Sequence, residues 1–297
     1  MMRDRSILIT GATSGIGLET ARNLAWQGAT LILACRNPEK AYRVCASLLR
    51  ESGNPRISVT ALDLASLRSV RQCIADVRAR HNRLDVLINN AGAFFLQRQE
   101  TEDGFERTMA TNYFGPFLLT AGLIPLLVQG SGARIVNVSS DAYCYGRLDL
   151  NDLQLTRRYD GFRAYATSKL AVQLWTQELA ERLEGRGVMA NSLHPGHVAT
   201  NIWQLWSRPA WYQKLLQRLI TAAMISPAAG AETTTYLASS PEVAGISGAY
   251  FVQRRPRRVA KPATDWRLQR ELWRASEELT GAMDYRCWTT PSRKEIP

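Results

Sequence analysis

The feature that most constrains the fold of this chain is a regular alternation of short apolar runs with segments of helical periodicity. Six runs have the composition of short buried strands: Ile7–Thr10, Thr30–Cys35, Ile57–Leu62, Val86–Asn89, Arg134–Ser139 and Val188–Leu193. Helical periodicity lies between or after them, at Leu18–Gln27, Ala41–Glu51, Leu67–His81 and Tyr165–Glu184. Strands joined by crossover helices form a parallel sheet with both faces covered. The pattern therefore predicts an α/β fold with a mainly parallel, doubly wound sheet.

The domain organisation follows from the length and from the absence of dividers. No low-complexity linker or internal repeat splits the 297 residues. We expect a single Rossmann-type domain over residues 1–253, with a substrate lid at about residues 201–225, and a basic C-terminal extension at residues 254–297. From Arg254 to Lys294 there are eleven Arg or Lys residues and five Asp or Glu residues. This excess suits either a solvated tail or contact with phosphates or an acidic membrane surface.

The compartment is predicted from what the sequence lacks. No apolar run reaches the roughly 20 residues of a membrane span, and the N-terminus leaves no room for a signal peptide. Five cysteines without close pairs and three histidines favour a reduced compartment without structural zinc. The net charge of +11 comes without a pattern of RNA-stacking aromatics, so no nucleic acid is expected as a partner. We expect a cytoplasmic protein, with peripheral membrane contact through residues 201–225 or the basic tail left open.

A glycine-rich segment, Thr10–Gly17, follows the first strand directly and opens the first helix. Glycines allow a tight turn and close backbone approach, and the N–H groups of a helix N-terminus attract a pyrophosphate. The alternative is a simple turn between strand and helix. The residues expected to contact a dinucleotide here are Gly11, Ser14, Gly15, Ile16 and Gly17.

The next two strand ends carry residues that refine the choice of nucleotide. Arg36 stands where an acidic residue would bind the ribose hydroxyls of NAD, and a guanidinium there suits the 2′-phosphate of NADP. Asp63 and Leu64 follow the third strand, where the carboxylate could hold the adenine amino group. Asp63 could equally cap the helix that begins near Ser66.

Several motifs occur together in the order found in the short-chain dehydrogenases/reductases, which this chain resembles. They are Gly11-xxx-Gly15-x-Gly17, Asn89-Asn90-Ala91-Gly92, Thr111-Asn112-Tyr113, Ser139-Ser140, Tyr165-Ala166-Thr167-Ser168-Lys169 and His194-Pro195-Gly196. The resemblance covers about Ser6 to Val252. It is similar above all to the retinol dehydrogenase-like branch, through Ala34-Cys35-Arg36, the gap from Ser140 to Tyr165 and the late segment Glu271–Gly281.

The resemblance implies a reaction and a role for each motif. Hydride moves between a nicotinamide and the substrate carbon while Tyr165 moves the proton. Ser140 hydrogen-bonds the substrate oxygen, Lys169 also holds the ribose hydroxyls of the cofactor, and Asn112 supports a water-linked proton path to Lys169. Further expected cofactor contacts are Asn90, Ala91, Gly92, Pro195, Gly196, Val198 and Thr200.

The spacing of Tyr165 and Lys169 has its own chemical logic. A tyrosine with a pKa near 10 is a poor acid or base at neutral pH unless a cation favours its phenolate. Lys169 lies four residues later on the same helix face, so we expect its ammonium to lower the pKa of Tyr165. His194 and His197 lack a nearby Cys, Asp or Glu at ligand spacing, so no metal site is expected.

The segment Asn201–Ile225 contains three tryptophans and no acidic residue. Three interpretations stay open: a lid over a lipophilic substrate, a helix resting on a membrane surface, and core packing or a homodimer contact. The first functional hypothesis is an NADP-dependent oxidoreductase that interconverts an alcohol and a carbonyl on a small lipophilic, retinoid-like substrate. The second is an NADP-binding sensor or scaffold with little catalytic activity.

Overall fold

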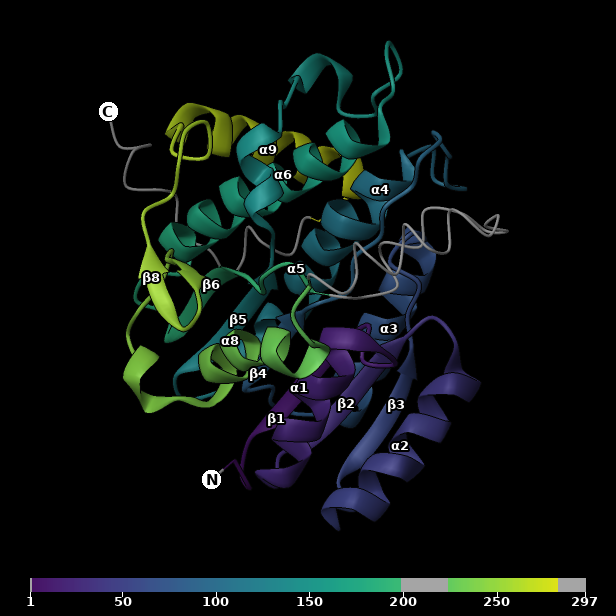
Figure 1. Ribbon diagram of the computed structural model, residues 1–297, viewed down its shortest axis with the longest axis vertical. Coiled ribbons are helices and arrows are strands. Elements are labelled where there is room, and N and C mark those ends of the chain that lie inside the picture. Colours follow the sequence, from purple (N-terminus) through teal and green to yellow (C-terminus); the bar gives the residue numbers. More distant parts are fainter. Residues whose placement is uncertain (1, 199–223, 283–297) are drawn as a thin grey trace.

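The computed structural model of the protein describes residues 2–198 and 224–282, which form an eight-stranded sheet covered by helices (Figure 1). The strand order is β3-β2-β1-β4-β5-β6-β7-β8. The strands are β1 (Ser6–Thr10), β2 (Thr30–Cys35), β3 (Ile57–Ala61), β4 (Val86–Asn89), β5 (Ala133–Val138), β6 (Val188–His194), β7 (Tyr250–Val252) and β8 (Arg255–Arg257). All neighbours pair in parallel except β7 and β8. The order reverses between β1 and β4, and sheets of this kind bind ligands at the carboxyl ends of the strands there.

Helices cover both faces of the sheet. The side chains of β1 alternate between them: Ile7 and Ile9 belong to one hydrophobic cluster and Leu8 to the other. The first cluster includes residues of α1 (Gly15–Trp26), α2 (Pro38–Ser52) and α8 (Pro227–Ser239). The second includes residues of α3 (Leu67–Arg80), α5 (Gly115–Leu127), α6 (Gly161–Arg182) and α9 (Trp266–Thr280). The expected doubly wound α/β fold is confirmed.

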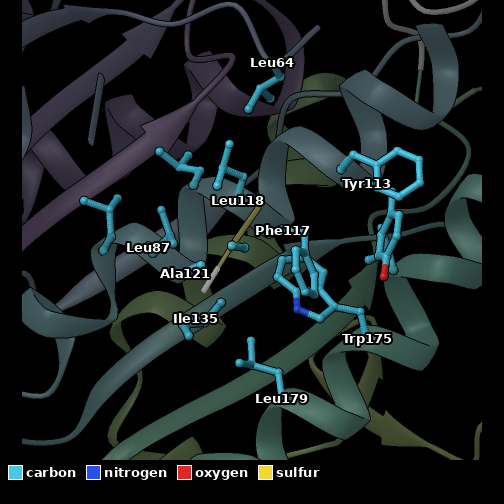
Figure 2. Packing of buried hydrophobic residues seen from close by; sticks show 14 of the residues in the cluster. Leu64, Leu87, Tyr113, Phe117, Leu118, Ala121, Ile135, Trp175 and Leu179 are labelled. Atoms are coloured by element: carbon cyan, nitrogen blue, oxygen red, sulfur yellow. The ribbon is translucent and has the colours of Figure 1, made fainter. Parts of the chain in front are cut away.

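The core of the second face is built on a helix that the sequence analysis did not predict. It runs through α4 (Arg107–Met109), a π-helical turn η1 (Ala110–Phe114) and α5. Figure 2 shows Phe117 of α5 packed beside Trp175 of α6, with ring centroids 5.8 Å apart. Nearly every residue of α5 is buried, so its apolar residues follow no period that would reveal a helix.

The same helix bears on the expectation that no segment is apolar enough to cross a membrane. Among the described residues, Arg107–Leu127 meets the length and composition of a membrane span. However, 89% of its apolar window is buried inside the protein. We therefore assign it to the core of the fold.

The chain beyond Arg254 differs from the expected appended tail. β8 pairs with β7 at the edge of the sheet, and α9 packs against α6 (Figure 1). Trp273 of α9 is 1% exposed, and its ring lies 5.2 Å from that of Phe117 and 4.5 Å from the guanidinium carbon of Arg182. The sequence analysis did not recognise α9 as an amphipathic helix because many of its residues are charged. Residues 254–282 pack as part of the fold rather than as an appended tail.

Candidate active site

The glycine-rich turn between β1 and α1 is fastened to the turn that follows β4. Thr10 Oγ1 accepts hydrogen bonds from the backbone N–H groups of Asn90 and Ala91, both at 3.0 Å. The side chain of Asn90 donates to the carbonyl oxygen of Thr10 at 2.9 Å. A Cβ atom on Gly17 would overlap the Asn90 amide and the Gly11 carbonyl oxygen. Glycine at position 17 therefore allows α1 to approach both turns closely.

The start of α1 faces a cleft of about 690 Å³ at the carboxyl ends of the strands. Ser14 occupies the N-cap position of α1 without a side-chain capping hydrogen bond, which leaves the first N–H groups of the helix for a ligand. The cleft is lined by the following predicted site residues: Gly11, Ser14, Gly15, Ile16, Gly17, Arg36, Asp63, Leu64, Asn90, Ala91, Gly92, Ser140, Tyr165, Lys169, Pro195, Gly196 and Val198.

Two cations border the cleft where β2 ends. Arg36 follows the strand, as expected, and Lys40 in the first turn of α2 also lines the cleft. Asn37 caps α2 by accepting the Lys40 N–H at 2.9 Å, which fixes the start of this helix beside the cleft. The sequence analysis missed Lys40, although its place one helical turn after Arg36 was a usable signal.

The structure separates the two roles left open for Asp63. Ser66 is the N-cap of α3 and accepts the N–H of Ser69 at 3.3 Å. Asp63 accepts the N–H of Ala65 at 3.0 Å and lines the cleft. The capping role predicted for Asp63 as an alternative is therefore wrong, because Ser66 already fills that position.

Tyr165 and Lys169 lie one turn apart on α6. Lys169 Nζ lies 5.6 Å from the centroid of the Tyr165 ring and donates to the carbonyl oxygen of Val138 at 3.0 Å. Burial lowers the pKa of Lys169 to about 8. Burial raises the pKa of Tyr165 to about 12; a hydrogen bond with Ser140 opposes this, and the charge of Asp141 adds to it. The expected lowering of the Tyr165 pKa does not appear, because burial disfavours the charged form of both groups.

Asn112 lies in the π-turn η1 and is buried just behind the cleft lining. Its Oδ1 accepts the N–H of Ala93 at 2.7 Å, and its Nδ2 donates to the Ala93 carbonyl oxygen and to Ser168 Oγ, both at 2.9 Å. The side chain thus joins the loop after β4 to α6. π-turns inside helices occur frequently at functional sites.

A carboxylate joins the two histidines that the sequence analysis set aside. Asp141 begins the 3₁₀ turn η2 (Asp141–Tyr145) after β5. Its Oδ2 lies 3.3 Å from His197 Nε2 and 3.8 Å from His194 Nε2. Sequence spacing gave no sign of this carboxylate, because Asp141 stands 53 positions before His194.

This cluster has the side chains of a metal site but not the hydrogen-bond arrangement of one. The backbone N–H of Asp141 donates to His194 Nδ1 at 3.3 Å, so the ring proton of neutral His194 is on Nε2. Burial lowers the pKa of His194, which keeps the ring neutral. The nitrogen that faces Asp141 Oδ2 therefore carries a proton where a metal ion would need a lone pair, and we assign no metal to the cluster.

Two aromatic pairs contain Tyr165 or the residue one turn before it on α6. Phe94 contacts Tyr165 edge to face, with ring centroids 5.9 Å apart. Phe162 lies one turn before Tyr165 on α6, and its ring is 6.0 Å from that of Tyr145. Tyr165 is 8% exposed, Phe162 46% and Tyr145 71%. Of these side chains, Phe94 and Tyr165 line the cleft.

Two predictions fall outside the described residues. Thr200 and residues 201–223 of the expected lid belong to the part of the chain that the structure leaves undescribed. On either side of it, Val198 and Ile225 form an isolated parallel bridge, and the Ile225 N–H donates to the His197 carbonyl oxygen at 2.9 Å. The lid stays a prediction.

A crevice at the reversal point of a doubly wound parallel sheet is typical of dinucleotide-binding proteins, and the buried Tyr165 and Lys169 line it. The sequence also matches the short chain dehydrogenase family over residues 5–210. The protein belongs to this family, and within it to the retinol dehydrogenase-like proteins.

Three comparisons support this assignment. Retinol dehydrogenase 14 of Homo sapiens is 42% identical over 296 residues, covering 95% of this chain and 88% of that protein. Polyprenol dehydrogenase of Mus musculus is 39% identical over 285 residues, covering 94% of this chain and 84% of that protein. The crystal structure of a short chain dehydrogenase from Escherichia coli CFT073 complexed with NADPH has a TM-score of 0.67 at 26% identity, covering 86% of this chain and 98% of that one. The predicted family resemblance is confirmed.

Proposed function

We propose that this protein is an NADP-dependent enzyme that interconverts an alcohol and a carbonyl group on a lipophilic substrate. The observation that carries the proposal is the pair Tyr165 and Lys169, buried at the cleft that the glycine turn opens. Burying two ionisable side chains costs stability, and groups whose pKa values are perturbed in this way cluster at active sites. This favours an enzyme over the NADP-binding sensor or scaffold.

The residues of the cleft fit the cofactor. The uncapped start of α1 suits a pyrophosphate, and Asp63 and Leu64 lie where an adenine ring would extend. Arg36 and Lys40 together suit the 2′-phosphate that distinguishes NADP from NAD. The NADPH complex of the Escherichia coli relative supports the same choice.

In the proposed reaction, bound NADPH would supply a hydride to the carbonyl carbon, and bound NADP⁺ would accept one from the alcohol carbon. Tyr165 gives a proton to the substrate oxygen in carbonyl reduction and takes it back in alcohol oxidation. Ser140 hydrogen-bonds the same oxygen and orients it. Lys169 would favour the phenolate that reduction leaves on Tyr165 and would hold the ribose hydroxyls of the bound cofactor, while Asn112 fixes the loop after β4 against α6.

A lipophilic substrate is supported by the described residues. Phe94 contacts Tyr165 and lines the cleft, so it would pack against the apolar body of a substrate whose oxygen reaches Tyr165, and Phe162, one turn before Tyr165 on α6, would extend that contact. Two relatives are named for retinol and polyprenol, which are lipophilic alcohols. Such substrates dissolve in bilayers, so we propose a cytoplasmic enzyme that contacts membranes peripherally. A homodimer stays a prediction, to be measured by light scattering.

The test is turnover. Purified protein is incubated with NADPH or NADH and a series of aldehydes and ketones of increasing apolar length, and cofactor oxidation is followed by absorbance. We expect NADPH to be preferred and long apolar substrates to have the highest kcat/KM. Stoichiometric NADPH binding without turnover of any substrate in the series, in either direction, would instead support the sensor or scaffold.

A further inference from the structure

The wall of the cleft beside Tyr165 is made by the loop that follows β4. Phe94 and Phe95 of this loop both line the cleft, and the ring of Phe94 contacts that of Tyr165. A loop lacks the regular hydrogen bonds that fix the backbone of a helix or a strand. The position of the two phenylalanine rings therefore depends on the side chains that hydrogen-bond to the loop from other elements.

Two such side chains hold the loop, one on each side of Phe94. Asn112 binds both backbone polar groups of Ala93, as described above. Tyr159, in the connection that leads into α6, donates its hydroxyl proton to the carbonyl oxygen of Phe95 at 2.8 Å. Phe94 therefore lies between two residues whose backbone is fixed by side chains of other segments.

The start of α6 closes on the same carbonyl group. A Cβ atom on Gly161, the first residue of α6, would lie 2.6 Å from the Phe95 oxygen and 3.0 Å from the Cα of Leu96. The backbone of Gly161 is helical, so glycine provides room for the loop there rather than conformational freedom. The Phe95 carbonyl group is thus held between the Tyr159 hydroxyl and the first turn of α6.

The single proton of the Tyr159 hydroxyl has a second oxygen within reach, because Glu106 Oε1 lies 3.3 Å away. The Glu106 carboxylate already accepts the backbone N–H groups of Thr108 at 2.9 Å and Met109 at 2.8 Å. The shorter contact, to Phe95, therefore takes the proton. Burial, with a contribution from the charge of Glu106, raises the pKa of Tyr159 to about 12, so the hydroxyl remains a donor at neutral pH.

We propose that Tyr159 is a positioning residue for the substrate, because its hydrogen bond to Phe95 keeps the rings of Phe94 and Phe95 where an apolar chain would pack. This rests on the proposed function and adds to it a residue outside the predicted catalytic set. The two rings would contact the apolar body of a substrate rather than its reacting oxygen. Displacing them should therefore raise the KM of long apolar substrates and change kcat little.

Tyr159→Phe removes the hydroxyl alone and keeps the ring. With NADPH as the cofactor, we expect the KM for decanal to rise roughly five- to ten-fold, the size of one lost hydrogen bond, and kcat and the KM for propanal to change less than about two-fold. A general loss of structure would instead lower the apparent kcat for both aldehydes equally, because less of the protein would be active. Tyr236→Phe is the matched control, since it removes a hydroxyl that also lies beside a carboxylate, that of Glu242 at 2.9 Å, and it should change neither KM.

Gly161→Ala disturbs the same contact from the other side, because its methyl group would displace the Phe95 carbonyl. We expect a rise in the KM for decanal and none for propanal. The double substitution Tyr159→Phe/Gly161→Ala should raise the KM for decanal by less than the product of the two single effects, since both release one carbonyl group. Effects that multiply independently would contradict this shared contact and overturn the proposal.

Fluorine NMR tests the position of the loop without substrate. In protein labelled with para-fluorophenylalanine, Phe94→Leu and Phe95→Leu assign the two signals of the loop. Tyr159→Phe should shift or broaden both, and should leave the signal of the buried Phe251 in β7 unchanged, which shows that the fold is intact. Unchanged loop signals, or a KM that rises equally for both aldehydes, overturn the proposal. The NMR measurement needs no turnover, so a protein inactive on every aldehyde would contradict the proposed function and still leave the action of Tyr159 on the loop tested.

Discussion

The two ends of the cleft differ in the chemical groups that line them and in how far these groups are buried. The nucleotide end consists of backbone N–H groups, glycines and the accessible cations Arg36 and Lys40. The chemical end consists of the buried Tyr165 and Lys169, whose pKa values burial shifts in opposite directions. Solvent screens the first set of charges and hardly reaches the second. Substitutions at the nucleotide end should therefore change affinity in small steps, and substitutions at the chemical end should change rate and pH dependence.

The largest expected effect is that of Tyr165→Phe. Removing the proton donor should lower kcat by roughly a thousand-fold, within the range for general acid catalysis. NADPH affinity, measured by fluorescence titration, should stay within about three-fold, because that affinity arises mainly at the other end. Tyr145→Phe removes a hydroxyl from an exposed tyrosine and is the control. If Tyr165→Phe weakened NADPH binding as much as it lowered kcat, the two ends of the cleft would not have the separate roles described above.

Lys169→Met should change how stability depends on pH. The pKa of Lys169 falls from 10.5 to about 8 on folding, so between these values the unfolded chain binds a proton that the folded protein does not. Stability of the wild type should therefore rise with pH across this window, by up to about 3 kcal/mol, and Lys169→Met should lack that rise. Urea unfolding at about pH 8 and about pH 10 measures it. The control is Lys40→Met, which replaces a partly exposed lysine. This variant should show the same increase of stability with pH as the wild type.

Arg36→Asp should weaken NADPH binding by roughly ten- to a hundred-fold, the size of one charged hydrogen bond. NADH binding should change much less, since NADH has no 2′-phosphate. Calorimetric titration compares the two cofactors, and Lys40→Ala should produce a smaller loss of the same kind. Arg43→Asp makes the same charge change on an exposed part of α2 and serves as the control. Equal losses for both cofactors would show that Arg36 does not contact the phosphate.

The smallest effect is expected for Phe162→Ala. Its ring is half-exposed, so it should stabilise a bound apolar chain by about 1 kcal/mol. This corresponds to a KM about five-fold higher for long aldehydes and unchanged for short ones. Tyr42→Ala, which removes an exposed ring from α2, is the control and should leave both KM values unchanged. A uniform rise in KM for all chain lengths would contradict the proposed contact between Phe162 and the apolar chain of the substrate.

The nucleotide end could be predicted from sequence because its signals are local. The turn from Thr10 to Gly17 is a contiguous segment, and Arg36 directly follows a strand that was predicted with its observed bounds. Tyr165 and Lys169 are likewise neighbours on one helix. Such features require only that a strand or helix be recognised.

What could not be predicted depends on contacts between distant segments. Asp141 meets His194 and His197 only because β5 and β6 are neighbours in the sheet. The helix through Asn112 lacks periodicity because it is buried on all sides, and β8 consists of Arg-Pro-Arg with every residue exposed. α9 carries enough charge to look like a tail, although Trp273 is buried.

The packing of α9 has a consequence for how the protein is made. A ribosome releases the N-terminal strands first, and α9 emerges after all the described strands. Until then Phe117 and the adjoining surface of α6, which Trp273 covers in the finished protein, stay open to solvent. Tyr113 also lacks the hydroxyl of Ser276, its 2.7 Å partner. The nascent chain therefore exposes an aromatic surface until α9 has been synthesised and packs against α6.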